Sequence, residues 1–115
     1  MITTNVLGTE YKVSLSDLNN PDLADCSGKC FTELKEIVVR DPEYILFNST
    51  DVEKQNVFKQ VLLHELVHAY SKESGTHYDD DESLTDWVAQ MIPKIIKSYN
   101  EVLSQLQELE AKSNG

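Results

Sequence analysis

The segment that most constrains this chain is an apolar stretch, residues 61–70, that contains the pattern H-E-x-x-H. His64 and His68 are four residues apart, so they lie one turn apart on the same face of a helix. Two imidazoles placed in this way can present nitrogen atoms to one tetrahedral zinc ion. Glu65 lies about 100° further round the helix, which is too far for a natural third ligand but close enough to reach a water on the metal. The pattern therefore indicates a zinc site in which Glu65 accepts a proton from that water.

The alternative is a chance occurrence of the same residues on the surface of an amphipathic helix. The surroundings disfavour it, because unpaired histidine and glutamate side chains are unfavourable to bury in an apolar segment. All three histidines of the chain also fall between positions 64 and 77. We therefore interpret His64, Glu65 and His68 as the centre of a catalytic zinc site.

A catalytic zinc site needs a third protein ligand and one open position. Glu82 is our preferred third ligand, because it begins a second helix fourteen residues after the second motif histidine and can point back across an antiparallel helix pair. The structural alternative is that Glu82 forms a capping box with Asp79 or stabilises the helix dipole. His77, on the loop between the helices, is a second ligand candidate. Metzincins place a histidine six residues after the second motif histidine, where this chain has Ser74.

Three further residues near the motif have candidate roles. Asp86 lies one turn after Glu82, where its carboxylate could hold the second nitrogen of a zinc-bound histidine; the alternative is a solvated helix charge. His77 and Tyr78 are the local candidates for stabilising an oxyanion. We expect Trp87 to fill the core rather than to bind substrate.

The chain is expected to form one α+β domain over residues 1–115. A helix over residues 51–74 is predicted by a capping box of Thr50 and Glu53 and by a glycine stop at Gly75. A second helix begins near Glu82, and Pro93 should kink it or split it in two. A small, mostly antiparallel N-terminal sheet should pack on the first helix. Its strands are predicted at Ile2–Val6 and at residues 11–15, 31–32, 37–40 and 44–47.

The segment after Pro93 carries an apolar stripe that needs burial. Residues 102–109 approximate heptad spacing over only about two turns, which is short for a coiled coil. We predict that this tail, from about residue 100, either frays or pairs with a second copy in a weak homodimer, which we favour. Residues 111–115 should fray.

The charge balance excludes some classes of partner. The chain has 20 acidic and 10 basic residues and a net charge of −10, which disfavours nucleic acid and anionic membranes as partners. We see no signal peptide and no membrane-spanning segment, and we expect a soluble, cytoplasmic protein. In that reducing compartment Cys26 and Cys30 are expected to be thiols near a turn.

The motif and its surroundings resemble a known family of zinc peptidases. Around H-E-L-V-H the chain resembles the zincins, and more closely the small gluzincins related to the ImmA/IrrE metallopeptidases, especially short peptidases encoded by phages or prophages. The likeness covers about residues 8–97. It implies a short sheet on the active-site helix, one zinc ion held by His64, His68 and Glu82, and Glu65 as base. The chain departs from ImmA in having Val67 where a glycine is usual, and we expect no attached DNA-binding domain. The residues that carry the resemblance are residues 64–70, 73–75, 81–82, 86–89 and 93–95.

The sequence thus predicts a zinc-dependent metallopeptidase that hydrolyses peptide bonds of an unidentified protein substrate. The alternative is a non-catalytic zincin-fold protein in which zinc is structural and the apolar C-terminal stripe recruits a partner. Glu65 disfavours the alternative, because a purely structural zinc site needs no base and closes its fourth position.

Overall fold

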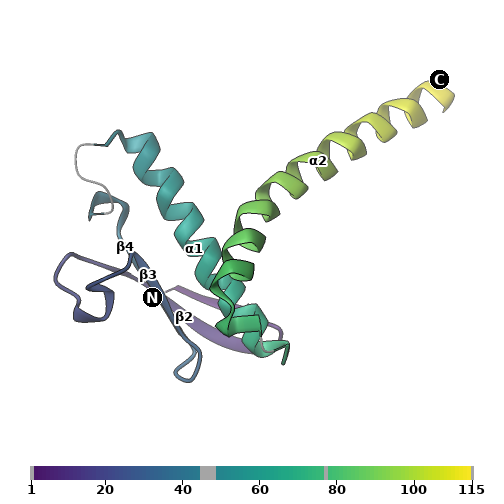
Figure 1. Cartoon of the computed structure of the whole chain (residues 1–115). Helices are drawn as coiled ribbons and strands as arrows, with labels where there is room; N and C mark the ends of the chain where they lie inside the picture. The colour runs from purple at the N-terminus through teal and green to yellow at the C-terminus, as the bar shows by residue number, and fades with distance from the viewer. Residues whose placement is uncertain (1, 45–48, 77, 115) are drawn as a thin grey trace.

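The computed structural model describes residues 2–44, 49–76 and 78–114 and has an α+β fold (Figure 1). Four strands form one sheet and two helices follow it. Three short 3-10 helices, Pro21–Leu23, Pro42–Tyr44 and Tyr78–Asp80, occupy the connections. The strands are β1 (Ile2–Val6), β2 (Thr9–Ser16), β3 (Gly28–Phe31) and β4 (Glu36–Arg40), and the helices are α1 (Asp51–Glu73) and α2 (Glu82–Asn114).

The sheet has the strand order β1-β2-β4-β3. β1 and β2 form an antiparallel hairpin, whose turn residues Leu7 and Gly8 both have positive φ, as a type I′ turn requires. β2 and β4 pair in parallel, and β3 returns antiparallel to β4. The prediction of a small, mostly antiparallel sheet is therefore confirmed, and β3 lies at its edge.

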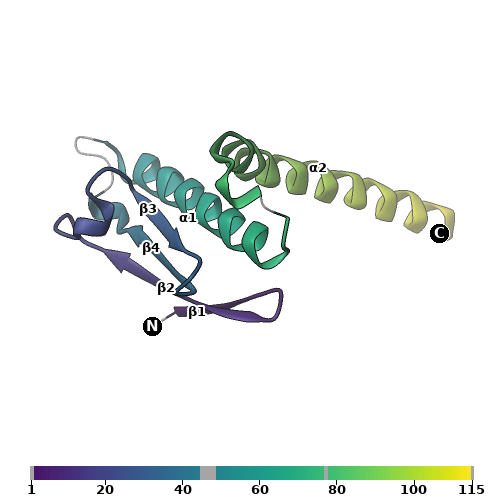
Figure 2. The same ribbon diagram turned by 60° about the horizontal axis from the view of Figure 1, so that its bottom comes forward.

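α1 lies along one face of the sheet, as Figure 2 shows. Alternate residues of β2 and β4 point toward it, because successive side chains of a strand face opposite sides. The core between the two layers is closed by the helix residues Phe58, Val61, Leu62, Leu66 and Ala69. The buried strand residues of this core are Val6, Tyr11, Val13, Ile37 and Val39.

The predicted ends of α1 are confirmed to within one residue. The Glu53 backbone N–H donates to Thr50 Oγ1 over 3.2 Å, and the Thr50 N–H donates to Glu53 Oε1 over 3.3 Å, which completes the capping box. Such a cap stabilises a helix by about 1 kcal/mol. After the last helical residue, Gly75 takes a positive φ of 73°. The length and position of the motif helix therefore follow from its capping residues.

A set of hydrogen bonds at the end of α1 fastens the helix to the sheet. Glu73 accepts hydrogen bonds from Thr9 Oγ1 at 2.8 Å, Tyr11 Oη at 2.7 Å and Lys35 Nζ at 2.6 Å. The bond from Lys35 and the two hydroxyl bonds lower the pKa of the Glu73 carboxyl to about 2. This network was not predicted from the sequence.

α2 is one helix that continues through Pro93 to Asn114, so the prediction of a kinked helix is confirmed over its alternative, a split at Pro93. Residues 111–114, which were predicted to fray, are helical. A proline inside a helix removes one backbone hydrogen bond and bends the helix without having to end it. α2 does bend before it extends away from the sheet (Figure 1).

The remaining strand predictions are confirmed only in part. β3 begins at Gly28, three residues before the predicted strand at 31–32, and the strand predicted at 37–40 is β4. Of the strand predicted at 44–47, Tyr44 belongs to a 3-10 helix, and the rest lies outside the described residues. In the described part of the chain, neither long helix has the unbroken apolar stretch that crossing a bilayer requires.

Candidate metal centre and active site

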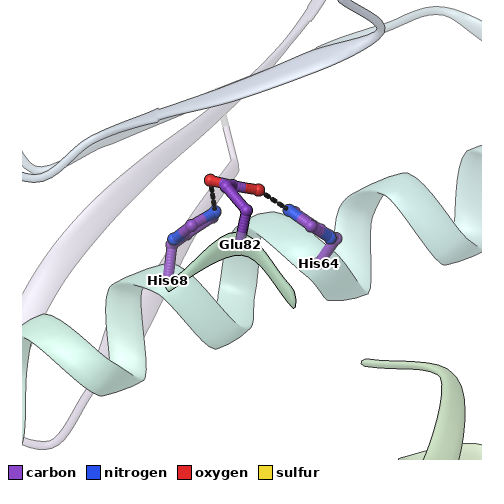
Figure 3. A group of neighbouring side chains, drawn as sticks. All are labelled: His64, His68 and Glu82. Carbon is purple, nitrogen blue, oxygen red and sulfur yellow. Dashed lines mark hydrogen bonds and ion pairs between the residues drawn. The ribbon is translucent and has the colours of Figure 1, made fainter. Parts of the chain in front are cut away.

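Three side chains predicted as zinc ligands converge at one point (Figure 3). His64 Nε2 lies 3.0 Å from Glu82 Oε2, and His68 Nε2 lies 2.9 Å from Glu82 Oε1. The two rings lie one turn apart on α1, with their centroids 4.9 Å apart and in an edge-to-face arrangement. Both histidines thus present the same nitrogen, Nε2, to one carboxylate from the start of α2.

Glu82 reaches the histidines because another residue caps α2. The Asp81 carboxylate accepts from the Leu84 N–H over 3.0 Å, so Asp81 is the N-terminal cap. Glu82 follows it in the first turn, and its side chain points back toward α1. From this position the Glu82 carboxylate contacts both His64 and His68.

The donor set fits a zinc ion. One ligand atom from each of His64, His68 and Glu82 lies within 4.8 Å of the others. Zinc bonds of about 2.0–2.1 Å in a tetrahedron put donor atoms roughly 3.3 Å apart, so small rotations of these side chains would admit the ion. Two imidazoles and one carboxylate also match the ligand types of catalytic zinc sites, which leave a fourth position open.

Glu65 lies beside this group and is almost completely buried, with 7% of its surface exposed. Burial raises the pKa of its carboxyl, and the charge of Glu82 adds to this effect. His64, His68 and a hydrogen bond from the Cys30 backbone N–H act in the opposite direction. Glu65 thus lies between the motif helix and β3, next to the group of His64, His68 and Glu82 without belonging to it.

A cleft of about 480 Å³ exposes the group to solvent. One wall is the segment from Cys26 to Thr32, which includes the edge strand β3, and the other wall contains the motif. A smaller hollow of about 200 Å³ adjoins it and adds Gln60 and Asp86 to the lining. The residues that line the larger cleft are Cys26, Gly28, Lys29, Cys30, Thr32, His64, Glu65, His68, Asp80 and Glu82.

Other predicted residues lie near the site or away from it. Asp86 Oδ1 is 3.6 Å from His64 Nδ1, which is longer than a hydrogen bond, while its Oδ2 accepts from Gln90. Tyr78 is exposed and lines an apolar groove instead of the cleft. His77 lies outside the described residues. Trp87 is 59% exposed, so its predicted place in the core is wrong.

The contribution of β3 was missed from the sequence. Gly28, Lys29 and Thr32 line the cleft, although the sequence analysis gave none of them a role. The available signal was the glycine in C-S-G-K-C, because a glycine in a strand often marks a close approach of another element. Cys26 and Cys30 are thiols on the wall of the cleft and form no disulfide, as expected.

Comparison with known proteins identifies no relative: no protein family, no curated protein and no solved structure matches the chain. The site therefore has to be interpreted from its own geometry.

Proposed function

We propose that this chain is a zinc-dependent peptidase of the gluzincin type, in which His64, His68 and Glu82 hold the metal and Glu65 is the general base. The observation that carries the proposal is that both Nε2 atoms face the Glu82 carboxylate at 3.0 and 2.9 Å, while Glu65 lines the same cleft. The substrate class is the peptide bond of a protein whose identity the site does not specify.

A zinc ion in this site would polarise a water molecule and the carbonyl of the scissile bond. Glu65 accepts the proton of the attacking water and then donates it to the nitrogen of the leaving amine. Its position between α1 and β3 restricts its side chain, which favours a fixed orientation toward the cleft. The cleft between β3 and the ligands is the place where we expect a peptide segment to bind.

The resemblance to the ImmA/IrrE-related peptidases is consistent with this assignment, and a phage or prophage origin remains part of the proposal. We also propose that the protein works in the cytoplasm, because two thiols line its cleft and a reducing compartment preserves them. The net charge of −10 favours protein substrates over nucleic acid.

A non-catalytic zinc-binding protein is the second candidate, and the exposed apolar residues of α2 favour it. Two features of the site favour the enzyme instead. A structural zinc site closes all four positions with protein ligands, whereas the group found among the described residues contains three. A structural site also has no use for a buried carboxylate such as Glu65 on the wall of the cleft.

The test compares the zinc-loaded protein with its Glu65→Gln variant on a library of peptides from a digested proteome. We expect the variant to retain zinc and to lose activity by about 10²–10⁴-fold, because only the base is removed. Glu101→Gln, an exposed change on α2, is the matched control and should cleave like the parent. Equal cleavage by Glu65→Gln, or no cleavage by the zinc-loaded parent, would contradict the proposal.

A further inference from the structure

The second half of α2 extends away from the rest of the chain and is exposed on all sides (Figures 1 and 2). Every residue from Pro93 to Ser113 is exposed. The radius of gyration is 17.6 Å, whereas a compact domain of this length has about 13 Å. Exposed large apolar side chains recur along this half. They are Ile95, Ile96, Tyr99, Val102, Leu103, Leu106 and Leu109, each 36–61% exposed.

Five of these side chains, all except Ile96 and Leu103, belong to a longer heptad series than the sequence analysis recognised. A split at Pro93 would have ended the series there, but α2 is continuous, so the spacing extends back to Val88. Seven positions then alternate in steps of four and three over more than three heptads, the length that a coiled coil needs. The positions are Val88, Ile92, Ile95, Tyr99, Val102, Leu106 and Leu109.

The first two positions of the series lie in an apolar groove. Val88 and Ile92 form one wall of a groove of about 560 Å³, and Leu63 and Val67 of α1 are on the opposite wall. α1 and α2 diverge from this end of the molecule (Figure 1), and along α2 the series passes from Ile92 on the groove to the exposed Ile95 one turn further on. The groove and the exposed stripe therefore form one continuous apolar surface.

The charges of the chain are divided between its two parts. Residues 1–86 contain 17 acidic and 7 basic residues, whereas residues 87–115 contain 3 of each. The body therefore carries the whole net charge of −10, and the tail is neutral. The positions that flank the heptad series are also uncharged near its middle, where Ile96, Ser98, Leu103 and Gln105 lie. A second copy can thus approach the tail without like-charge repulsion, provided that the two bodies stay apart.

We propose that two copies of this chain pair antiparallel through α2, with a two-fold axis near Ser98 and Tyr99. In this arrangement Leu106 and Leu109 of each copy reach the level of Val88 and Ile92 of the other, so the end of each tail fills the other groove. The contact is self-complementary and closes as a dimer. A parallel pair would instead bring the two acidic bodies side by side and leave both grooves open. The inference does not depend on the proposed peptidase activity.

The first test is the mass of the full chain in solution, measured by sedimentation equilibrium over a range of concentrations. We expect twice the 13.1 kDa chain mass for the parent. Leu106→Glu should restore the mass of a single chain, and Gln107→Glu, which adds the same charge about 100° round the helix and outside the heptad series, should not. A parent that stays monomeric, a dimeric Leu106→Glu or a monomeric Gln107→Glu would overturn the proposal. Circular dichroism checks that each variant keeps its helix content.

The second test is the direction of pairing, measured by pulsed electron paramagnetic resonance. A spin label on Ala111→Cys, with Cys26 and Cys30 changed to serine, reports one distance between copies. The antiparallel pair predicts about 40 Å, from 1.5 Å of helix rise per residue, whereas a parallel pair predicts roughly 15–20 Å. A single distance in the shorter range would overturn the antiparallel arrangement.

Discussion

A Cβ atom on Gly28 would lie 3.2 Å from Cγ and 3.4 Å from Oε2 of Glu65, so the edge strand lies directly against the side chain of the proposed general base. The same atom would stand only 2.6 Å from Cγ1 of Val61, which is closer than carbon atoms tolerate. Glycine is therefore the residue that lets β3 lie close against the motif helix. This contact limits the positions that the Glu65 carboxylate can take.

Gly28→Ala should displace β3 or Glu65 and so lower both activity and stability. Overpacking of this kind costs about 1–3 kcal/mol of the free energy of unfolding. Urea denaturation measures the loss, and peptide cleavage by the zinc-loaded variant measures the effect on the base. Ser27→Ala is the control at the neighbouring residue. An alanine variant with the stability and activity of the parent would show that the close contact has no consequence.

Glu82→Ala should weaken zinc binding far more than changes to the neighbouring candidates. Glu82 faces both histidines, whereas Asp86 lies 3.6 Å from His64 Nδ1. Loss of a residue that holds a metal-binding side chain in place typically weakens metal affinity by about 10–100-fold. We therefore expect Asp86→Ala to weaken zinc affinity by that factor or less, and Glu82→Ala to weaken it by more. Competition with a chromogenic chelator measures the affinities. If His77→Ala proved to be the damaging change, the gluzincin assignment would be wrong.

Glu73 predicts a specific dependence of stability on pH. Its pKa is lowered from 4.5 to about 2 by Lys35, Tyr11 and Thr9, so the unfolded chain binds this proton first as the pH falls. The contribution of Glu73 is complete above about pH 4.5 and is lost as the pH falls toward about 2. Glu73→Gln should therefore show a flatter loss of stability over that interval, measured by thermal melting. An identical acid dependence in the variant and the parent would contradict this account.

Removal of the chain after Tyr99 should leave zinc binding unchanged, because every proposed ligand precedes that residue. The same truncation removes Val102, Leu106 and Leu109 and should abolish the dimer. Zinc content and sedimentation of the shortened chain measure the two effects separately. Loss of zinc would show that the tail supports the folded body, which the exposure of residues 93–113 argues against.

The sequence analysis was correct for those parts of the fold that depend on residues close together in the sequence. The capping box of Thr50 and Glu53 and the stop at Gly75 placed α1, and helix periodicity put His64 and His68 on one face. The convergence of Glu82 on both histidines followed the expectation that an antiparallel helix would bring it back. In each case the determining residues lie within one helix or one short connection.

The features that the sequence analysis missed depend on contacts between distant segments. Gly28 meets Glu65 from a strand far away in the sequence, and Glu73 joins β2 to the turn that precedes β4. At Pro93 the sequence left a kinked helix and a split helix open, and the structure has the kinked one because the chain is helical on both sides of the proline. Trp87 was assigned to the core because of its size, but the face of α2 that carries it is exposed. Burial of a single residue is decided by packing that local patterns do not contain.

The most direct test of the zinc assignment is the metal content of protein purified without added metal, measured by inductively coupled plasma mass spectrometry. The account predicts about one zinc ion per chain in the parent, because catalytic zinc sites of this type have three protein ligands. It predicts none in the His64→Ala, His68→Ala double variant, which keeps only Glu82 of the three. Absence of zinc from the parent even after reconstitution, or one zinc ion per chain retained by the double variant, would contradict the central claim.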